Sequence, residues 1–432
     1  MCPHNPKKER SVNSCVAVIL TGVLLLVPTA YAEAGADSLK QQAVEAYKTG
    51  RYPAAVSLMQ QAVAENSDDA ETHFRLGWYL HYLSYDSRPL SGFSLETSDQ
   101  ILFHLDRALE LDPGLGNARY FIGAEYGVRA REALRTGDIE KAEAEFRAGR
   151  SKGGFPDWMI EYGRNVLKAC KQDAILFTGG DAETNPIEYL QLVEGYRCDV
   201  TVVPMALLDV PWFARLLRDG LEHAVVPAPI SWSDAQLVSM RPYKWQACTL
   251  QIPRGSGESS ARAMMSWYVE PDLSTGKKTF LSAGRALLID IIETNAWLRP
   301  VYFSVGIPEP RLAGLKPHLQ LCGLAYELLP VETAEPDTKR IEDVLLDPES
   351  YQDLADLKEH DMPRASRILL NYHSVLLQLV VWHAKSGNSD KARDVLDRMA
   401  ELLPGDVLPI PEPMRKMADG LRATLKGTDG EH

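Results

Sequence analysis

Glycines, acids and an amide follow an apolar segment in the stretch ILFTGGDAETNPIEYL, residues 175–190. The apolar residues predict a strand, which we expect to end at the two glycines. Asn185 and Pro186 suit the N-cap and first position of a helix, and Glu188 then falls where a capping box needs an acid. Helix capping leaves Asp181 unexplained. We expect it at the carboxyl end of the strand, where open α/β sheets bind ligands.

The charge of this segment restricts the ligand that it could bind. Free amides at a helix start favour anions, but Asp181, Glu183 and Glu188 would repel a phosphate. Sugar hydroxyls or a hard cation suit the acids better. Asp209, just after the next predicted strand, could add a carboxylate. The competing interpretation is an acidic helix cap that binds nothing.

A second candidate lies in NAWLRPVYF, where Trp297 and Arg299 precede an apolar run. Arg299 could bind a carboxylate bidentately or stack on a ring. It could instead pair with an acid of its own domain while Trp297 packs in the core, and the commonness of such pairs favours this second interpretation. Neither an HExxH nor a CxxC motif occurs, so the sequence predicts no catalytic residue, metal or cofactor.

Helical repeats supply the first elements around these residues. In residues 46–63, small and large side chains recur at tetratricopeptide spacing, and two further imperfect units follow. The second unit is interrupted by an insertion at residues 81–99, and a related hairpin lies at residues 376–404. A single unit cannot bury its apolar face, so the units must stack and form a concave surface for protein partners. Aromatic residues near the insertion could line that surface: Trp78, Tyr79, Tyr82 and Tyr85.

A different pattern separates the helical parts. Short β-branched runs at residues 173–179 and 198–205 flank a predicted helix, which indicates a βαβ unit with parallel strands. Residues 299–306 and 324–332 predict two more strands, and residues 251–280 look like an irregular excursion. We therefore expect an α/β fold with α-helical repeats, in which tetratricopeptide-like hairpins flank a small Rossmann-like parallel-sheet domain. The predicted boundaries are 1–32 for a signal peptide, 33–171 for the repeats, 172–335 for the α/β domain and 336–432 for a C-terminal hairpin and tail.

The first 32 residues have the pattern of a secretory signal peptide, with basic residues, an apolar stretch and small residues before a cleavage point. An uncleaved anchor is the alternative. No later segment is long and apolar enough to span a membrane, so we expect a periplasmic or otherwise exported protein. The net charge of −13, without basic runs, disfavours nucleic acid as a partner. Four cysteines after the predicted cleavage point could pair in three ways or stay as isolated thiols: Cys170, Cys198, Cys248 and Cys322.

Three stretches, residues 173–213, 289–306 and 315–332, resemble one family. It is the soluble extracytoplasmic region of bacterial membrane proteins of unassigned function, which are related to transmembrane protein O-mannosyltransferases. Members carry Gly-Asp-Asn-Asp-Thr-Phe-Pro after a strand, and this sequence keeps the types of Gly180, Asp181, Thr184 and Pro186. The membrane glycosyltransferase region has no counterpart here, so the resemblance implies the fold and not transferase activity. The candidate ligand-binding residues are Gly180, Asp181, Thr184, Asn185, Asp209 and Arg299.

The sequence thus predicts an exported binding or assembly factor of the cell envelope. Its expected partner is an envelope protein that binds the repeats, and the resemblance suggests machinery of surface glycans or protein glycosylation. The alternative is a carbohydrate-binding module or an enzyme of glycan metabolism that uses the acidic segment after the first strand.

Overall fold

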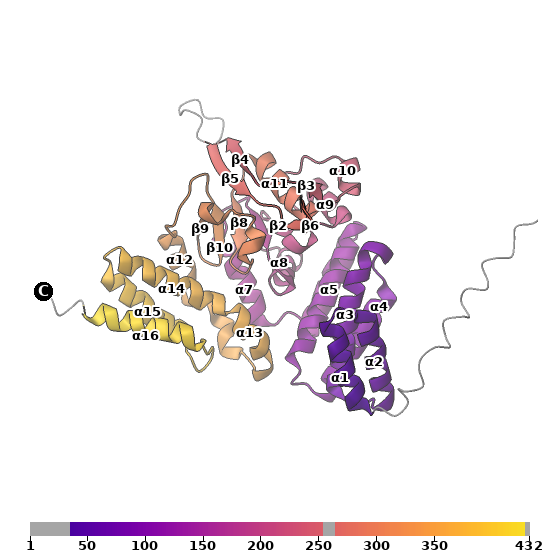
Figure 1. Cartoon of the computed structure of the whole chain (residues 1–432). Coiled ribbons are helices and arrows are strands. Elements are labelled where there is room, and N and C mark those ends of the chain that lie inside the picture. Colours follow the sequence, from indigo (N-terminus) through magenta and orange to yellow (C-terminus); the bar gives the residue numbers. More distant parts are fainter. Residues whose placement is uncertain (1–34, 254–263, 428–432) are drawn as a thin grey trace, which may run out of the picture. The chain divides into compact units, whose positions relative to one another are not determined.

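The computed structural model describes residues 35–253 and 264–427 (Figure 1). The chain divides into two compact units, residues 1–67 and residues 68–432. The predicted signal peptide, residues 1–32, lies outside the described residues. Among the helices of the described ranges, none is both long and apolar enough to cross a membrane.

The first unit contains a helical hairpin. Its helices, α1 (Ala36–Lys48) and α2 (Tyr52–Glu65), pack against each other. Gly50 adopts a φ of 73° in the turn between them, a conformation that favours glycine. The spacing of small and large residues places one face of α2 in the contact, where Ala55, Met59 and Ala62 are buried.

The second unit begins with two more helical hairpins. Helices α3 and α4 form the first and helices α5 and α6 the second. The insertion at residues 81–99 does not form a separate loop, because α3 simply continues through most of it and α4 starts soon after. The bounds are α3 Ala70–Ser91, α4 Leu95–Leu111, α5 Gly116–Arg135 and α6 Ile139–Ser151.

A five-stranded sheet forms the centre of the α/β part, with strand order β2-β1-β8-β10-β9. Strand β1 pairs in parallel with both β2 and β8, which confirms the predicted βαβ unit and the α/β class. Strand β10 runs antiparallel to β8 and β9, so the sheet is mixed rather than wholly parallel. The bounds are β1 Ile175–Thr178, β2 Thr201–Pro204, β8 Val301–Ser304, β9 Leu319–Leu321 and β10 Ala325–Leu328.

The two faces of this sheet support two separate cores. Along β1, Leu176 belongs to one core while Ile175 and Phe177 belong to the other, because successive side chains of a strand point to opposite faces. Helices α7 (Asp157–Ala169) and α8 (Asp181–Glu194) supply the first core, and helix α11 (Ala283–Asn295) supplies the second. The continuous apolar runs in the sequence follow from this burial on both faces.

The predicted irregular excursion at residues 251–280 is wrong for its described part. Strands β4 and β5 pair in a two-stranded sheet, and β3, β7 and β6 form a three-stranded one. Burial alternates along β5, where Met265, Trp267 and Val269 are buried, and β6 is exposed throughout, so these strands are not buried on both faces. The bounds are β3 Tyr243–Lys244, β4 Cys248–Pro253, β5 Met264–Val269, β6 Leu273–Thr275 and β7 Lys278–Leu281.

The remaining helices complete the second unit. The predicted C-terminal hairpin is formed by α14 and α15, and α16, in yellow in Figure 1, packs against both. The proline-rich composition after residue 404 gave no indication of α16. The bounds are α9 Pro211–Asp219, α10 Asp234–Val238, α12 Thr338–Leu345, α13 Met362–Ile368, α14 Leu370–Lys385, α15 Ser389–Leu402 and α16 Glu412–Gly427.

Glycines allow α5 to approach three other segments closely. A Cβ added at Gly116 would collide with the carbonyl of His360, and one at Gly123 would collide with Gly154. At Gly127 it would lie 2.6 Å from Oδ1 of Asn185, at the start of α8. Helix α5 therefore contacts the α/β part and the C-terminal part along a face that excludes side chains.

We predict that Gly123→Ala lowers the free energy of unfolding of the second unit by about 1–3 kcal/mol, because the added methyl overpacks a backbone contact. Gly420→Ala is the matched control. Gly420 is also helical, but an added Cβ there meets nothing within 4 Å, so this change should be neutral or stabilise by up to about 1 kcal/mol. Urea denaturation measures the stability of both variants. Equal stabilities would contradict the close contact between Gly123 and Gly154.

Candidate functional site

Helix α8 begins at Asp181, with Gly180 as its N-cap. The predicted start at Asn185 and Pro186 is therefore wrong by about one helical turn, and Pro186 lies inside the helix. The acid that serves the helix start is Glu183, at the third helical position, whose Oε2 accepts the backbone N–H of Gly179 at 2.9 Å. An acid stands three residues after Gly180 and another stands three residues after Asn185. The spacing alone therefore could not show which of the two residues caps the helix.

Glu183 connects the ends of two parallel strands. Its side chain is buried, with 6% of the residue exposed, and Oε2 also accepts the hydroxyl of Ser304 at the end of β8 at 2.5 Å. Burial raises the pKa of Glu183, although the bonds from Ser304 and Gly179 act in the opposite direction. Its Oε1 is buried without a hydrogen-bond partner. The unpartnered buried oxygen makes the charged carboxylate less favourable here than in water.

The other polar residues of the segment converge on a buried arginine. Arg131 of α5 donates from Nε to Oε2 of Glu188 at 2.9 Å and from Nη2 to Oδ1 of Asn185. Its Nη1 lies 3.8 Å from the carboxylate of Asp181. Burial would lower the pKa of Arg131, but Glu188 and Asp181 raise it. The acids that suggested a ligand site thus stabilise a buried cation between α5 and α8.

The candidate residues occupy three separate places. Gly180, Asp181, Thr184 and Asn185 lie together at the start of α8, where the hydroxyl oxygens of Thr184 and Thr178 are 2.8 Å apart. Asp209 accepts the backbone N–H of Gly284 at 2.5 Å, at the start of α11. Each of these side chains has an internal partner, and their predicted role in ligand binding stays a prediction.

Arg299 lies at the opposite end of β1 from Asp181. It donates to the backbone carbonyls of Asp173, Ala174 and Pro227 and to the hydroxyl of Thr201, at 2.6–3.1 Å. The expected pairing with an acid is replaced by backbone acceptors, which tie three segments together. Arg299 therefore does not share a site with the segment at the start of α8.

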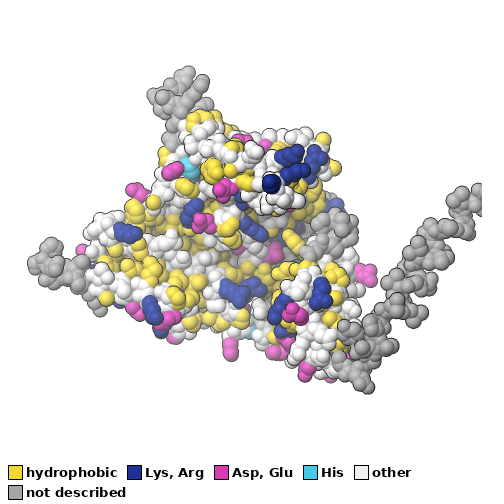
Figure 2. Space-filling model, viewed as in Figure 1, with side chains coloured by type: hydrophobic (Ala, Val, Ile, Leu, Met, Phe, Trp, Pro, Cys, Tyr) yellow, Lys and Arg dark blue, Asp and Glu magenta, His cyan; other side chains and the backbone are white. Residues whose placement is uncertain are grey.

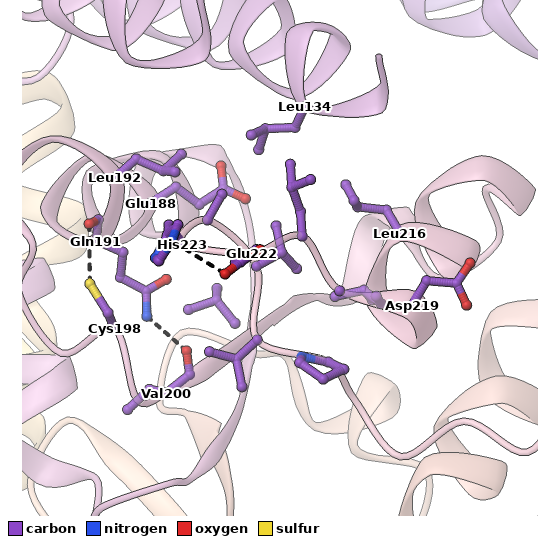
Figure 3. Close-up of a pocket in the computed structure, with 18 of the residues that line it drawn as sticks. Leu134, Glu188, Gln191, Leu192, Cys198, Val200, Leu216, Asp219, Glu222 and His223 are labelled. Carbon is purple, nitrogen blue, oxygen red and sulfur yellow. Dashed lines mark hydrogen bonds and ion pairs between the residues drawn. The ribbon is translucent and has the colours of Figure 1, made fainter. Parts of the chain in front are cut away.

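A cavity of about 470 Å³ lies near the edge strand β2, between α8 and α9 (Figure 3). Leu134 of α5 and apolar residues of all three elements line it, with Glu222 and His223 among the few polar side chains. Gln191 donates to the carbonyl of Val200 at 2.8 Å, so its amide is already engaged. This volume is in the range of ligand pockets, but the lining offers a sugar few hydrogen-bonding groups.

Aromatic side chains form a cluster on helices α3 and α5. Trp78 stacks on Phe121 with ring centres 5.8 Å apart, and Tyr82 lies edge-on to both. Tyr79 is buried and serves helix packing, whereas Tyr82 and Tyr85 are 37% and 45% exposed. The repeat helices therefore present aromatic surface to solvent.

Basic side chains gather over α10 and β3 (Figure 2). Arg218 of α9 lies 2.6 Å from the carboxylate of Asp234 in α10, and Arg215 lies 3.4 Å from it. Arg215 and Arg218 therefore join α9 to α10.

The four cysteines are all free thiols, two buried and two exposed. Burial raises the pKa of Cys322 to about 12. Within the described ranges, no group of three or more His, Cys, Asp or Glu side chains is arranged to hold a metal ion. Residues 149–153 have the Gly-x-Ser-x-Gly spacing of a nucleophile elbow, but they end α6 instead of joining a strand to a helix, and Ser151 donates to the carbonyl of Ala148.

Two protein-family models match the chain. Residues 159–246 and 254–346, about two fifths of the chain, match TMEM260-associated domain 2. Residues 40–81 match a tetratricopeptide repeat. No curated protein matches the chain significantly. The first match spans the whole five-stranded sheet and every candidate residue, and the second supports protein–protein interaction as the general role of the N-terminal helices.

We predict that Arg131→Ala lowers the free energy of unfolding by about 3 kcal/mol or more, because Glu188 would stay buried without its cation. Arg135→Ala, one turn further along α5, removes an exposed partner of Glu132 and should cost less than about 1 kcal/mol. Denaturation curves of both variants test the difference. Similar losses of stability in the two variants would show that the buried pair of Arg131 and Glu188 contributes no more than the exposed pair.

We predict a pH-dependent effect for Glu183→Gln. Because the folded-state pKa of Glu183 is raised, its contribution to stability is fully present below its unfolded pKa of about 4.5 and declines as pH rises above that value. The neutral amide removes this decline. The variant should therefore gain stability relative to the wild type between pH 5 and pH 8, as measured by urea denaturation at both values. A constant difference between the two proteins would contradict a raised pKa.

Proposed function

We propose that this protein is an exported binding or assembly factor of the cell envelope, which recognises a protein partner through its helical repeats. The observation that carries the proposal is the exposed aromatic surface of α3, in a chain with a tetratricopeptide repeat match. Aromatic residues are enriched where proteins recognise one another.

The location and the class of partner are further parts of this proposal. The signal-like pattern of residues 1–32 supports export. The sequence blocks shared with relatives of transmembrane O-mannosyltransferases support a partner in surface glycan or protein glycosylation machinery. The match to TMEM260-associated domain 2 covers the sheet that carries these blocks.

The alternative, a carbohydrate-binding module or glycan enzyme, depends on Asp181 and Asn185 being available to a ligand. Asn185 is buried and accepts from Arg131. The carboxylate of Asp181 is 42% exposed, so it is the residue on which this alternative rests.

We predict that affinity capture from a detergent-solubilised envelope extract enriches a protein partner, and that Tyr82→Ala combined with Tyr85→Ala abolishes the enrichment. Tyr268→Ala is the matched control, because this tyrosine is 52% exposed but lies on β5. The partner should be retained by that control and by Asp181→Ala. Mass spectrometry identifies the enriched proteins.

Two results would oppose the proposal. One is the absence of any partner enriched over a control resin. The other is binding of sugars or nucleotide sugars to the purified protein, measured calorimetrically and lost in Asp181→Ala, which would support the carbohydrate alternative.

A further inference from the structure

An arginine without an acidic partner lies where three parts of the second unit meet. Arg364 of α13 stacks on Tyr120 of α5, with its guanidinium carbon 3.6 Å from the ring centre. Its Nη2 reaches Oδ1 of Asn117 only at 3.4 Å, and its Nε is buried without an acceptor. No carboxylate of the described residues lies within 4.0 Å of this guanidinium.

This arrangement leaves most of the binding capacity of Arg364 unused. A guanidinium carries five N–H donors in a planar fork, and its removal from water is unfavourable unless acceptors replace the water. Arg131, on the same helix as Tyr120, shows the usual solution, because two carboxylates lie beside it. Arg364 has an aromatic face beneath it and one long bond to an amide.

Two exposed side chains lie near Tyr120, the ring on which this arginine stacks. Tyr82 of α3 and Asp181 of α8 are close enough to influence the ionisation of Tyr120, whose pKa is raised first by burial and then by Asp181, with Arg364 opposing. Tyr82 is 37% exposed and the carboxylate of Asp181 is 42% exposed, so the site opens to solvent. We call these four residues the junction patch: Tyr82, Tyr120, Asp181 and Arg364.

Other charged groups near the patch are mainly basic. Arg367, one turn further along α13, opposes the charge of Arg364 and is exposed. His360 lies near Arg119 and Lys358, which together with burial lower its pKa, whereas Asp361 acts in the opposite direction. An excess of cations in a chain with a net charge of −13 favours an anionic group as the missing partner.

We propose that the junction patch binds a carboxylate-bearing segment of a partner protein. Arg364 donates to the carboxylate, while Tyr82 and Tyr120 cover the apolar atoms next to it. Asp181 opposes a more strongly charged phosphate, which favours a carboxylate with its single charge. The inference rests on the proposed function, because it presumes that the chain binds proteins.

The test uses two fluorescein-labelled peptides, one with three repeats of Gly-Glu-Leu-Glu and one with three repeats of Gly-Gln-Leu-Gln. Fluorescence anisotropy with the full chain should show that the glutamate peptide binds at least about tenfold more tightly. Arg364→Gln should lower its affinity about tenfold, the loss expected for a charge-assisted hydrogen bond, with no effect on the glutamine peptide. Arg367→Gln, which removes the same charge from the same helix, should change the affinity less than about threefold.

Two further variants keep the test decisive. Arg364→Lys retains the charge without the planar fork, so it should give an intermediate affinity even where Arg364→Gln lowers the melting temperature. Asp181→Asn removes a nearby acid and should strengthen binding of the glutamate peptide by about twofold. Equal losses in Arg364→Gln and Arg367→Gln, or unchanged binding in Arg364→Gln, would overturn the assignment.

The same variants separate this inference from the function on which it rests. If a captured partner depends on Tyr82 and Tyr85 but not on Arg364, the inference fails and the proposed function stands. If no partner is captured and neither peptide binds, both fail.

Discussion

The buried guanidinium of Arg131 is the constraint that joins the helical repeats to the α/β part of the second unit. A cation removed from water destabilises the fold by several kcal/mol unless acids and amides surround it. The start of α8 supplies those groups from Asp181, Asn185 and Glu188. Gly127 makes this possible, because an added Cβ there would collide with the amide of Asn185. The register of α8 and the position of α5 therefore depend on one another.

This constraint gives the acids of the segment at the carboxyl end of β1 partners within the protein. Three of its acids have internal roles, since Glu188 and Asp181 lie beside Arg131 and Glu183 ties β1 to β8 through Gly179 and Ser304. The carboxylate of Asp181 keeps the weakest of these contacts, at 3.8 Å, and is the most exposed to solvent. The segment resembles a ligand-binding loop in composition because buried packing and ligand binding both require polar groups at a strand end.

Our proposals rest on surfaces that distant parts of the chain form together, and not on the acidic segment alone. The aromatic cluster of α3 and α5 belongs to the repeats, whereas the junction patch adds one residue from α8 and one from α13. The cavity near β2 is also lined by residues of four helices and strands, α5, α8, β2 and α9. Surfaces assembled in this way leave no local motif, since their side chains come from segments that are far apart in the sequence.

The sequence by itself determined the class of the elements that carry a clear periodic or apolar pattern, because that information is local. The period of small and large residues in 46–63 predicts a packed helical hairpin, and the β-branched runs around residues 175 and 201 predict a parallel pair, as the structure confirms. Strands β4 to β7 escaped prediction because they are not buried on both faces: burial alternates along β5, and β6 is exposed throughout. Strand β10 was expected in place, but its antiparallel direction depends on which neighbour it meets.

Only the tertiary structure decided what the polar side chains do. Arg131 falls four residues after Gly127 on α5, so it lies on the helix face that carries the glycine. This position was the one local sign that the charged side chain of Arg131 is buried. Nothing local connects it to Glu188, 57 residues away, or connects Arg364 to Tyr120. Propensity and periodicity depend on near neighbours along the chain, whereas the partner of a buried charge depends on which surfaces the folded chain brings together.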